Sequence, residues 1–179
     1  NEKESIHPGA DDNASGVAAL IEVAELLAAR LDAGELGARR DILFAAWSGE
    51  ALGLLGSTHW VNQESNDEVG SHSGHGSLEG QVTAYLNFDM VGRLEEDRLS
   101  LFGVASSPAW PQVIERENIA IGLPIDAQED SYLPTDATAF YTRRVPILAA
   151  FTGSHGEYHT PRDTPDKLDY LGIRSIAQL

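Results

Sequence analysis

Short apolar runs set the strongest constraint on how this chain can fold. They cover residues 41–47 (DILFAAW), 82–88 (VTAYLNF) and 145–151 (VPILAAF), and residues 99–104 form another candidate. Apolar runs of this length are typical of strands that are buried on both faces of a sheet. We therefore expect each run to form a β-strand inside the protein.

Helical patterns separate these runs. Apolar residues recur at three- and four-residue spacing over residues 17–31, which predicts an amphipathic helix that Asn13 or Ser15 would cap. Residues 108–118 predict a second helix that begins at a proline, and residues 173–179 resemble the start of a last one. Buried strands that alternate with helices favour an α/β fold, with helices layered on a central, largely parallel sheet.

The composition excludes several classes of function. Asp and Glu number 28 against 12 Lys and Arg, and the net charge of −16 argues against a nucleic-acid partner, which requires clustered positive charge. The chain has no Cys, which rules out thiolate metal sites, cysteine nucleophiles and disulfides. No apolar run approaches the length of a membrane span.

Polar residues that could bind a metal or take part in catalysis follow the predicted strands. Glu50 comes shortly after residues 41–47, Asp89 directly after residues 82–88, and His159 after residues 145–151, while Asp12 precedes the first helix. Each alone is equally well explained as a helix cap, a turn residue or a surface side chain. Together they are carboxylate and imidazole groups, which suit zinc. A pair of metal ions can polarise a peptide carbonyl, and a free Glu can act as general base.

Longer motifs surround these residues. They are residues 9–16 (GADDNASG), 47–57 (WSGEALGLLGS), 87–92 (NFDMVG) and 158–164 (YHTPRDT). In order and spacing they resemble the co-catalytic zinc exopeptidases that include bacterial leucyl aminopeptidases and glutamate carboxypeptidase, and the similarity runs from Pro8 to Ile173. The resemblance implies a layered α/β/α domain with a mixed, mostly parallel sheet, two zinc ions as in the family, and a peptide substrate.

The resemblance also assigns roles to single positions. Asp12 is similar to the carboxylate that bridges both metals, Asp89 to a ligand of the first metal, and His159 to a ligand of the second. Glu50 is similar to the general base that transfers the water proton to the leaving amine. Asp136 is expected to help shape the substrate pocket. The function implied is a zinc-dependent exopeptidase and, by family analogy, an aminopeptidase.

Two features depart from the family pattern. The family has a second glutamate where this chain has Ala51, and its upstream His-x-Asp motif has no counterpart here. His7 lies too close to Asp12 to replace that histidine, so we expect it to be an ordinary loop residue, and we expect Asp11 to support the loop. Each ion would then keep two protein ligands, which predicts weak binding. We expect residues 1–179 to be a single catalytic domain that is incomplete at both ends.

Other interpretations remain open at this point. Ala51 favours an inactive relative that keeps the fold for binding or as a scaffold. A single-zinc acyl chemistry like that of the related glutaminyl cyclases ranks last, because it uses the glutamate that Ala51 replaces. The polar tract over residues 63–80, with His72 and His75, is expected to be an exposed loop rather than a metal site. Substrate preference, compartment and oligomeric state are left open.

Overall fold

A central sheet of four strands organises the computed structural model, which describes residues 5–37, 40–66, 78–94 and 98–179. Its strands lie in the order β1-β4-β2-β3, with β1 paired parallel to β4, β2 parallel to β3, and β2 antiparallel to β4. The predicted mixed, mostly parallel sheet is confirmed. The strands are β1 (Tyr85–Phe88), β2 (Leu99–Phe102), β3 (Ile125–Ala127) and β4 (Ile147–Phe151).

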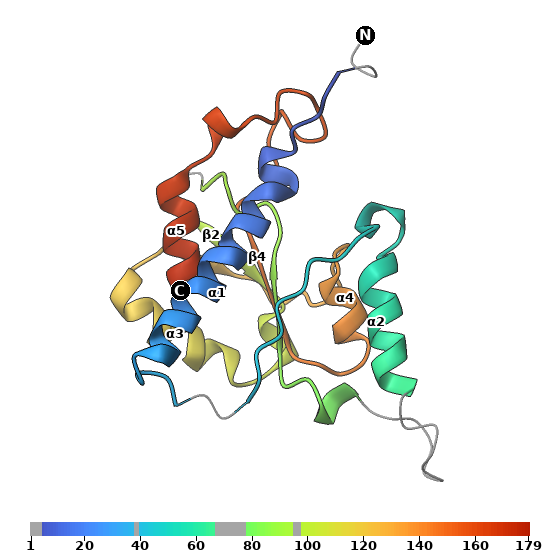
Figure 1. Ribbon diagram of the computed structural model, residues 1–179, viewed down its shortest axis with the longest axis vertical. Coiled ribbons are helices and arrows are strands. Elements are labelled where there is room, and N and C mark those ends of the chain that lie inside the picture. The colour runs from blue at the N-terminus through green and yellow to red at the C-terminus, as the bar shows by residue number, and fades with distance from the viewer. Residues whose placement is uncertain (1–4, 38–39, 67–77, 95–97) are drawn as a thin grey trace.

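Helices cover both faces of this sheet (Figure 1). Alternate strand residues point to opposite sides, so Leu99, Leu101 and Ala150 join one hydrophobic core, while Ile147 and Ala149 join another. Helices α1, α3 and α5 pack on the first core, and helices α2 and α4 on the second, which gives the predicted α/β/α layers. The helices are α1 (Gly16–Asp32), α2 (Leu55–Asn66), α3 (Trp110–Ile121), α4 (Ala137–Tyr141) and α5 (Tyr170–Gln178).

Most predicted elements are found where the sequence places them. Residues 82–88, 99–104 and 145–151 contain β1, β2 and β4, and the helical patterns correspond to α1, α3 and α5. Ser15 occupies the N-cap position of α1 without a side-chain cap hydrogen bond, and Oδ1 of Asn13 accepts a hydrogen bond of 3.1 Å from the Gly16 N–H. Ser15 instead turns its hydroxyl toward Asp11.

The strand predicted over residues 41–47 is wrong. This segment has no strand geometry, and Ile42 and Leu43 are 56% and 69% exposed. An apolar run becomes a buried strand only when neighbours pair with its backbone and cover its side chains. Within the described residues, β1 pairs only with β4, so residues 41–47 run past the sheet without joining it.

The polar tract over residues 63–80 is also more structured than expected. Its first residues belong to α2, and Leu78–Gly80 forms a 3₁₀ turn with Leu78 in the core. The loop and histidine predictions for the middle of the tract fall on residues 67–77, which lie outside the described residues.

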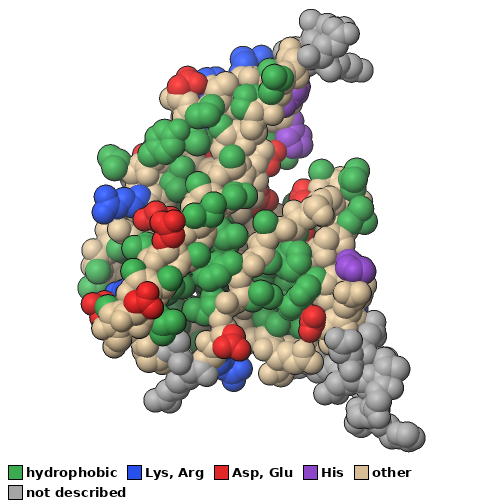
Figure 2. All heavy atoms as spheres, viewed as in Figure 1, with side chains coloured by type: hydrophobic (Ala, Val, Ile, Leu, Met, Phe, Trp, Pro, Cys, Tyr) green, Lys and Arg blue, Asp and Glu red, His purple; other side chains and the backbone are tan. Residues whose placement is uncertain are grey.

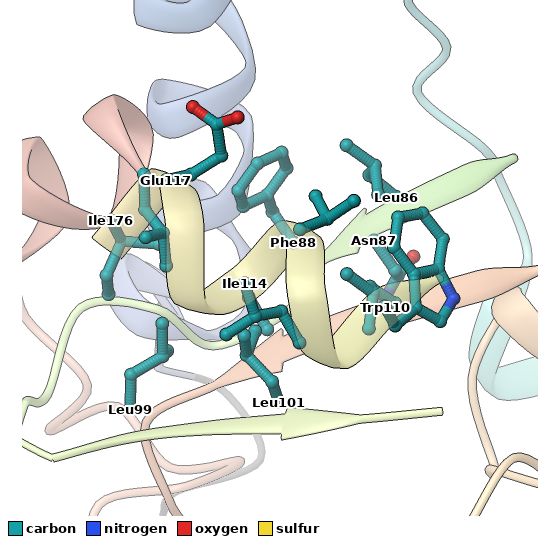
Figure 3. Close-up of a pocket in the computed structure, with 13 residues that line it drawn as sticks. Leu86, Asn87, Phe88, Leu99, Leu101, Trp110, Ile114, Glu117 and Ile176 are labelled. Atoms are coloured by element: carbon teal, nitrogen blue, oxygen red, sulfur yellow. The ribbon is translucent and has the colours of Figure 1, made fainter. Parts of the chain in front are cut away.

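An apolar cavity of about 150 Å³ lies between α3 and the sheet. Figure 3 shows Phe88, Leu101, Ile114 and Trp110 around it. Its one ionisable lining residue is Glu117, so we assign this cavity to packing rather than to chemistry. Among the helices described, none is long and apolar enough to cross a membrane.

Candidate metal centre

The site forms where the chain leaves β1 and β4. Because these neighbouring strands are parallel, their carboxyl ends meet at one edge of the sheet, which is where functional residues of α/β proteins collect. Asp89 follows β1 directly, and the segment that carries His159 follows β4. The loop before α1 is fixed at the same edge, since the Asn13 side chain donates to the Phe88 carbonyl at 3.1 Å and accepts from the Met90 N–H at 3.2 Å.

Asp12 and His159 are in direct contact. The Nε2 atom of His159 lies 2.9 Å from Oδ2 of Asp12, although the two residues are far apart in the sequence. A hollow of about 290 Å³ opens beside this pair. It is lined by His7, Gly9, Asp12, His159, Thr160 and Asp163. The structure therefore brings together two of the residues that the motifs single out as metal ligands.

Glu50 lies within electrostatic range of this pair. It begins a 3₁₀ turn (Glu50–Leu52) before α2, and Figure 2 shows a cleft with acidic and histidine side chains on its walls. Burial raises the pKa of Glu50, the negative charges of Asp136 and Asp12 raise it further, and His159 lowers it. Asp136 is fixed in turn by a 2.5 Å hydrogen bond from the Ser57 hydroxyl.

Asp89 lies partly buried within electrostatic range of several other carboxylates. Burial raises its pKa to about 6, helped by the charges of Asp12, Glu50, Asp136 and, more weakly, Asp11. A carboxylate responds in this way when like charges surround it without a matching cation. The four residues predicted to form the site thus share one acidic region that favours a bound cation.

Tyr158 also belongs to this region. Its ring stacks on the imidazole of His159 with the ring centroids 3.7 Å apart. Burial raises the pKa of the Tyr158 phenol, and the charges of Asp12, Asp89 and Glu50 raise it further. Its aromatic ring therefore restricts the orientation of the candidate histidine ligand.

The backbone is unusual at two points of the site. Met90, directly after Asp89, has φ of 53°, and His159 has φ of 55°; both lie in the left-handed region that non-glycine residues seldom adopt. Such conformations cost about 1–3 kcal/mol each and persist where surrounding contacts enforce them. At Met90 those contacts are two hydrogen bonds that its carbonyl accepts from Thr152, at 2.7 and 3.0 Å.

The side chains at this site are of types that bind zinc, but few of them lie close together. Carboxylate and imidazole are suitable zinc ligands, and Asp12 and His159 already meet. Over the described ranges, however, no group of three or more His, Asp or Glu side chains is arranged to hold one metal ion. Ala51 lies in the turn beside Glu50 and has no donor atom.

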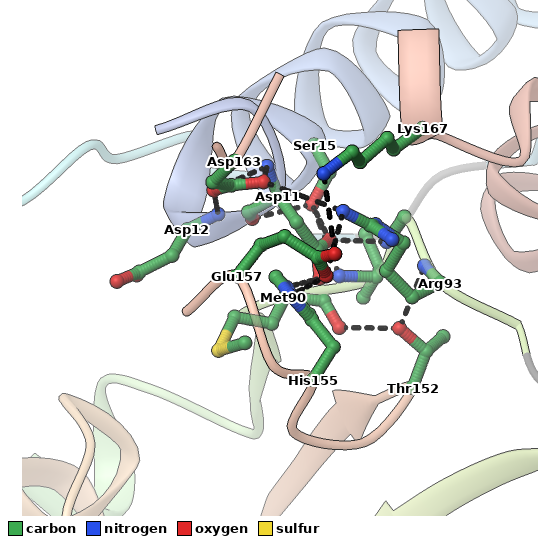
Figure 4. Close-up of polar contacts among 12 residues, drawn as sticks. Asp11, Asp12, Ser15, Met90, Arg93, Thr152, His155, Glu157, Asp163 and Lys167 are labelled. Carbon is green, nitrogen blue, oxygen red and sulfur yellow. Dashed lines mark hydrogen bonds and ion pairs between the residues drawn. The ribbon is translucent and has the colours of Figure 1, made fainter. Parts of the chain in front are cut away.

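A buried charged network beneath the site was missed by sequence reasoning. It comprises Asp11, Arg93, His155, Glu157 and Asp163 (Figure 4). Asp163 falls inside the motif at residues 158–164, but motif position alone does not reveal what a side chain contacts. The loop between β4 and α5 has no periodic pattern from which burial could be inferred.

Fold and site together define an α/β/α protein with an acidic, cation-attracting centre at the ends of parallel strands. The family model for Peptidase family M28 matches residues 3–179. The chain belongs to this family, and the resemblance expected from the four motifs is confirmed at that level.

Individual relatives agree with this assignment. An aminopeptidase of Pseudomonas aeruginosa is 40% identical over 158 residues, which cover 83% of this chain and 26% of the relative. Leupeptin-inactivating enzyme 1 of Streptomyces exfoliatus is 29% identical over 146 residues, or 82% of this chain and 30% of the relative. The chain thus spans less than a third of the length of these relatives.

Solved structures share the fold. The zinc aminopeptidase BSAP of Bacillus subtilis superposes with a TM-score of 0.74 at 23% identity, over 98% of this chain and 42% of that one. The aminopeptidase LapA of Legionella pneumophila gives a TM-score of 0.73 at 20% identity, over 96% of this chain and 44% of that one.

Proposed function

We propose that this chain is the catalytic domain of a zinc-dependent exopeptidase of the aminopeptidase type. Asp12 and Asp89 would hold one zinc ion, Asp12 and His159 would hold a second, and Glu50 would act as general base. The contact between Asp12 and His159, inside an acidic region at the ends of parallel strands, carries the proposal. Membership of Peptidase family M28, and relatives that are named aminopeptidases, support it.

Bound zinc would polarise the peptide carbonyl and lower the pKa of water, as metal ions do in hydrolases. Glu50 accepts the proton of the attacking water on its carboxylate and delivers it to the leaving amine nitrogen. Its raised pKa suits this role, because a general base works best when its pKa approaches the working pH. Tyr158 and the left-handed backbone at His159 restrict the imidazole to one orientation.

The charge of the cleft favours aminopeptidase over carboxypeptidase substrates. Burial raises the pKa values of Glu50 and Asp89, and the negative charge of Asp136 raises both further, so this wall of the cleft is rich in negative charge. A protonated α-amino group is attracted to such a surface, whereas a free α-carboxylate is repelled. We therefore infer that the substrate enters with its amino terminus toward Glu50.

Ala51 favours a second candidate function. Without a donor at this position the second metal loses a ligand of the family, and the domain would act as a binding or scaffold relative with little or no catalysis. The substitution Ala51→Glu distinguishes the two, because it restores the missing carboxylate. Tighter zinc binding by Ala51→Glu, together with a gain of hydrolysis, would identify Ala51 as the catalytic defect.

The deciding experiment combines zinc content with hydrolysis. The protein is brought to equilibrium by dialysis against buffer that contains free zinc at a fixed concentration, bound zinc is measured, and aminoacyl p-nitroanilides are tested beside their N-acetylated forms in the same buffer. We expect zinc to be retained and only the free-amine substrates to be cleaved. Retained zinc without any cleavage would favour the scaffold function, and failure to retain zinc would overturn the metal site.

A further inference from the structure

We propose that Asp163 is a positioning residue that sets the separation of the ligands Asp12 and His159. The inference rests on the proposed metal site. Asp163 lies four residues after His159 in the same loop, and its side chain is 3% exposed. It contacts the main chain of the Asp12 loop and not the Asp12 carboxylate, so it acts on the metal site through the backbone.

Three consecutive backbone N–H groups converge on Asp163. Its carboxylate accepts from the Asp11 N–H at 3.1 and 3.0 Å and from the Asp12 N–H at 3.1 Å. Its main-chain carbonyl accepts from the Ala10 N–H at 3.2 Å. Successive N–H groups that point at one anion form a compact and directional clamp. The loop that carries His159 is thereby tied to the loop that carries Asp12.

Asp11 extends the clamp to the segment after Asp89. Its Oδ1 atom accepts from the Gly92 N–H at 2.7 Å and from the Ser15 hydroxyl at 2.9 Å. Its Oδ2 atom lies 3.1 Å from Nε2 of His155. Figure 4 shows Asp11 among Asp163, Ser15 and His155, with the Asp12 side chain directed away from them. All three loops that supply the proposed ligands therefore meet at Asp11 and Asp163.

Cations lie beside two carboxylates of the network, Asp163 and Glu157. A terminal nitrogen of Arg93 lies 3.8 Å from Asp163 and 3.8 Å from Glu157, and Lys167 lies 3.1 Å from Glu157. Burying two carboxylates without such partners would cost several kcal/mol. A side chain that only fills space would not need two acceptor oxygens here, whereas a clamp on N–H groups uses both.

The test compares Asp163→Asn with Asp166→Asn, the same change at an exposed position of the adjacent 3₁₀ turn. An amide at position 163 turns one acceptor into a donor that faces a backbone N–H. Zinc affinity is measured by competition with a chromophoric chelator, and the visible spectrum of the Co²⁺-loaded protein reports ligand geometry. We expect Asp163→Asn to weaken zinc binding about 10- to 100-fold and to shift the spectrum, with Asp166→Asn unchanged.

Thermal unfolding in EDTA distinguishes a clamp from general stabilisation. A folded Asp163→Asn protein with native zinc affinity and spectrum would overturn the inference, even if its melting temperature fell. If Asp163→Asn does not fold, Asp163→Glu replaces it, because it keeps the charge beside Arg93 and displaces the oxygens; native zinc affinity there would equally overturn the clamp. Failure of the unsubstituted protein to bind zinc would overturn the proposed function itself.

Discussion

Glu50 and the proposed ligands share one acidic region but are expected to do different work. Replacing Glu50 by Gln keeps the shape of the side chain and removes its capacity to accept a proton. We expect Glu50→Gln to lower kcat by about 10²- to 10⁴-fold, the usual contribution of a general base. Zinc content should stay unchanged, as measured by elemental analysis beside kcat. The control is Glu22→Gln on the exposed face of α1; a parallel loss of zinc in Glu50→Gln would instead make Glu50 a ligand.

Asp89 makes the stability of the zinc-free protein depend on pH. Its pKa rises from an ordinary 3.8 to about 6 in the fold, so between these values the folded state holds a proton that the unfolded state has lost. The free energy of unfolding therefore falls as pH rises from about 4 to 6. Because Asp89 is partly exposed, we expect a loss of about 1–2 kcal/mol rather than the nearly 3 that two pKa units imply.

Comparison with Asp89→Asn isolates this effect. Glu50 and Asp136 also have raised pKa values and act in the same direction, while Glu157 and Asp166 have lowered values and act in the opposite one. These groups are common to both proteins, so the difference between their unfolding curves in EDTA belongs to Asp89. Equal pH dependence in the two proteins would contradict the prediction.

At the scale of elements, the turn after β1 depends on Gly92. A Cβ atom placed there would lie 2.6 Å from Cδ2 of Leu168 and 2.7 Å from Oδ1 of Asp11. We expect Gly92→Ala to destabilise the protein by about 1–3 kcal/mol, as overpacking does, and to weaken zinc binding by displacing Asp11. Denaturant unfolding and zinc competition measure the two effects. Gly37→Ala is the matched control, since nothing lies within 4 Å of its added Cβ atom. Equal stability of the two variants would show that the turn can relax.

The sequence predicts the elements well where local pattern and burial agree. Helix α1 and strands β1, β2 and β4 follow from apolar periodicity, because each finds the covering layer that its pattern requires. Residues 41–47 have the same apolar character and do not form a strand, since among the described residues no strand pairs with them. An apolar composition indicates that a segment favours burial. Whether the segment becomes a buried strand depends on whether another strand pairs with it in the folded protein.

The residues of the candidate site could likewise be predicted only in part from the sequence. Asp12, Glu50, Asp89 and His159 could be proposed from motifs, because ligands and bases belong to a small set of residue types. Asp163 and His155 could not be given roles, because their contacts depend on how three loops meet. Long-range hydrogen bonds of this kind leave no periodic trace in a sequence.

For the whole molecule, the net charge of −16 should govern how substrates approach. Attraction of a cationic amino terminus by the acidic cleft is screened as the Debye length falls from about 10 Å at 0.1 M salt to about 3 Å at 1 M. We expect kcat/KM for a lysyl p-nitroanilide to fall by roughly tenfold at most over this range. A glutamyl p-nitroanilide, whose side-chain carboxylate cancels the charge of its α-amino group, should respond much less. An equal response of both substrates would place the effect outside the electrostatics of the cleft.

The residues of the proposed site are attached to two different hydrophobic cores, one on each side of the sheet. The loops of Asp12 and His159 border α1 and α5 on one core, whereas Glu50 and the Ser57–Asp136 pair are attached to α2 and α4 on the other. Two of the proposed metal ligands and the proposed general base are therefore attached to separate halves of the protein. Loss of Glu50 from one half would abolish proton transfer while the proposed ligands on the other half remain, so descendants of such a domain could inherit a metal that serves architecture alone.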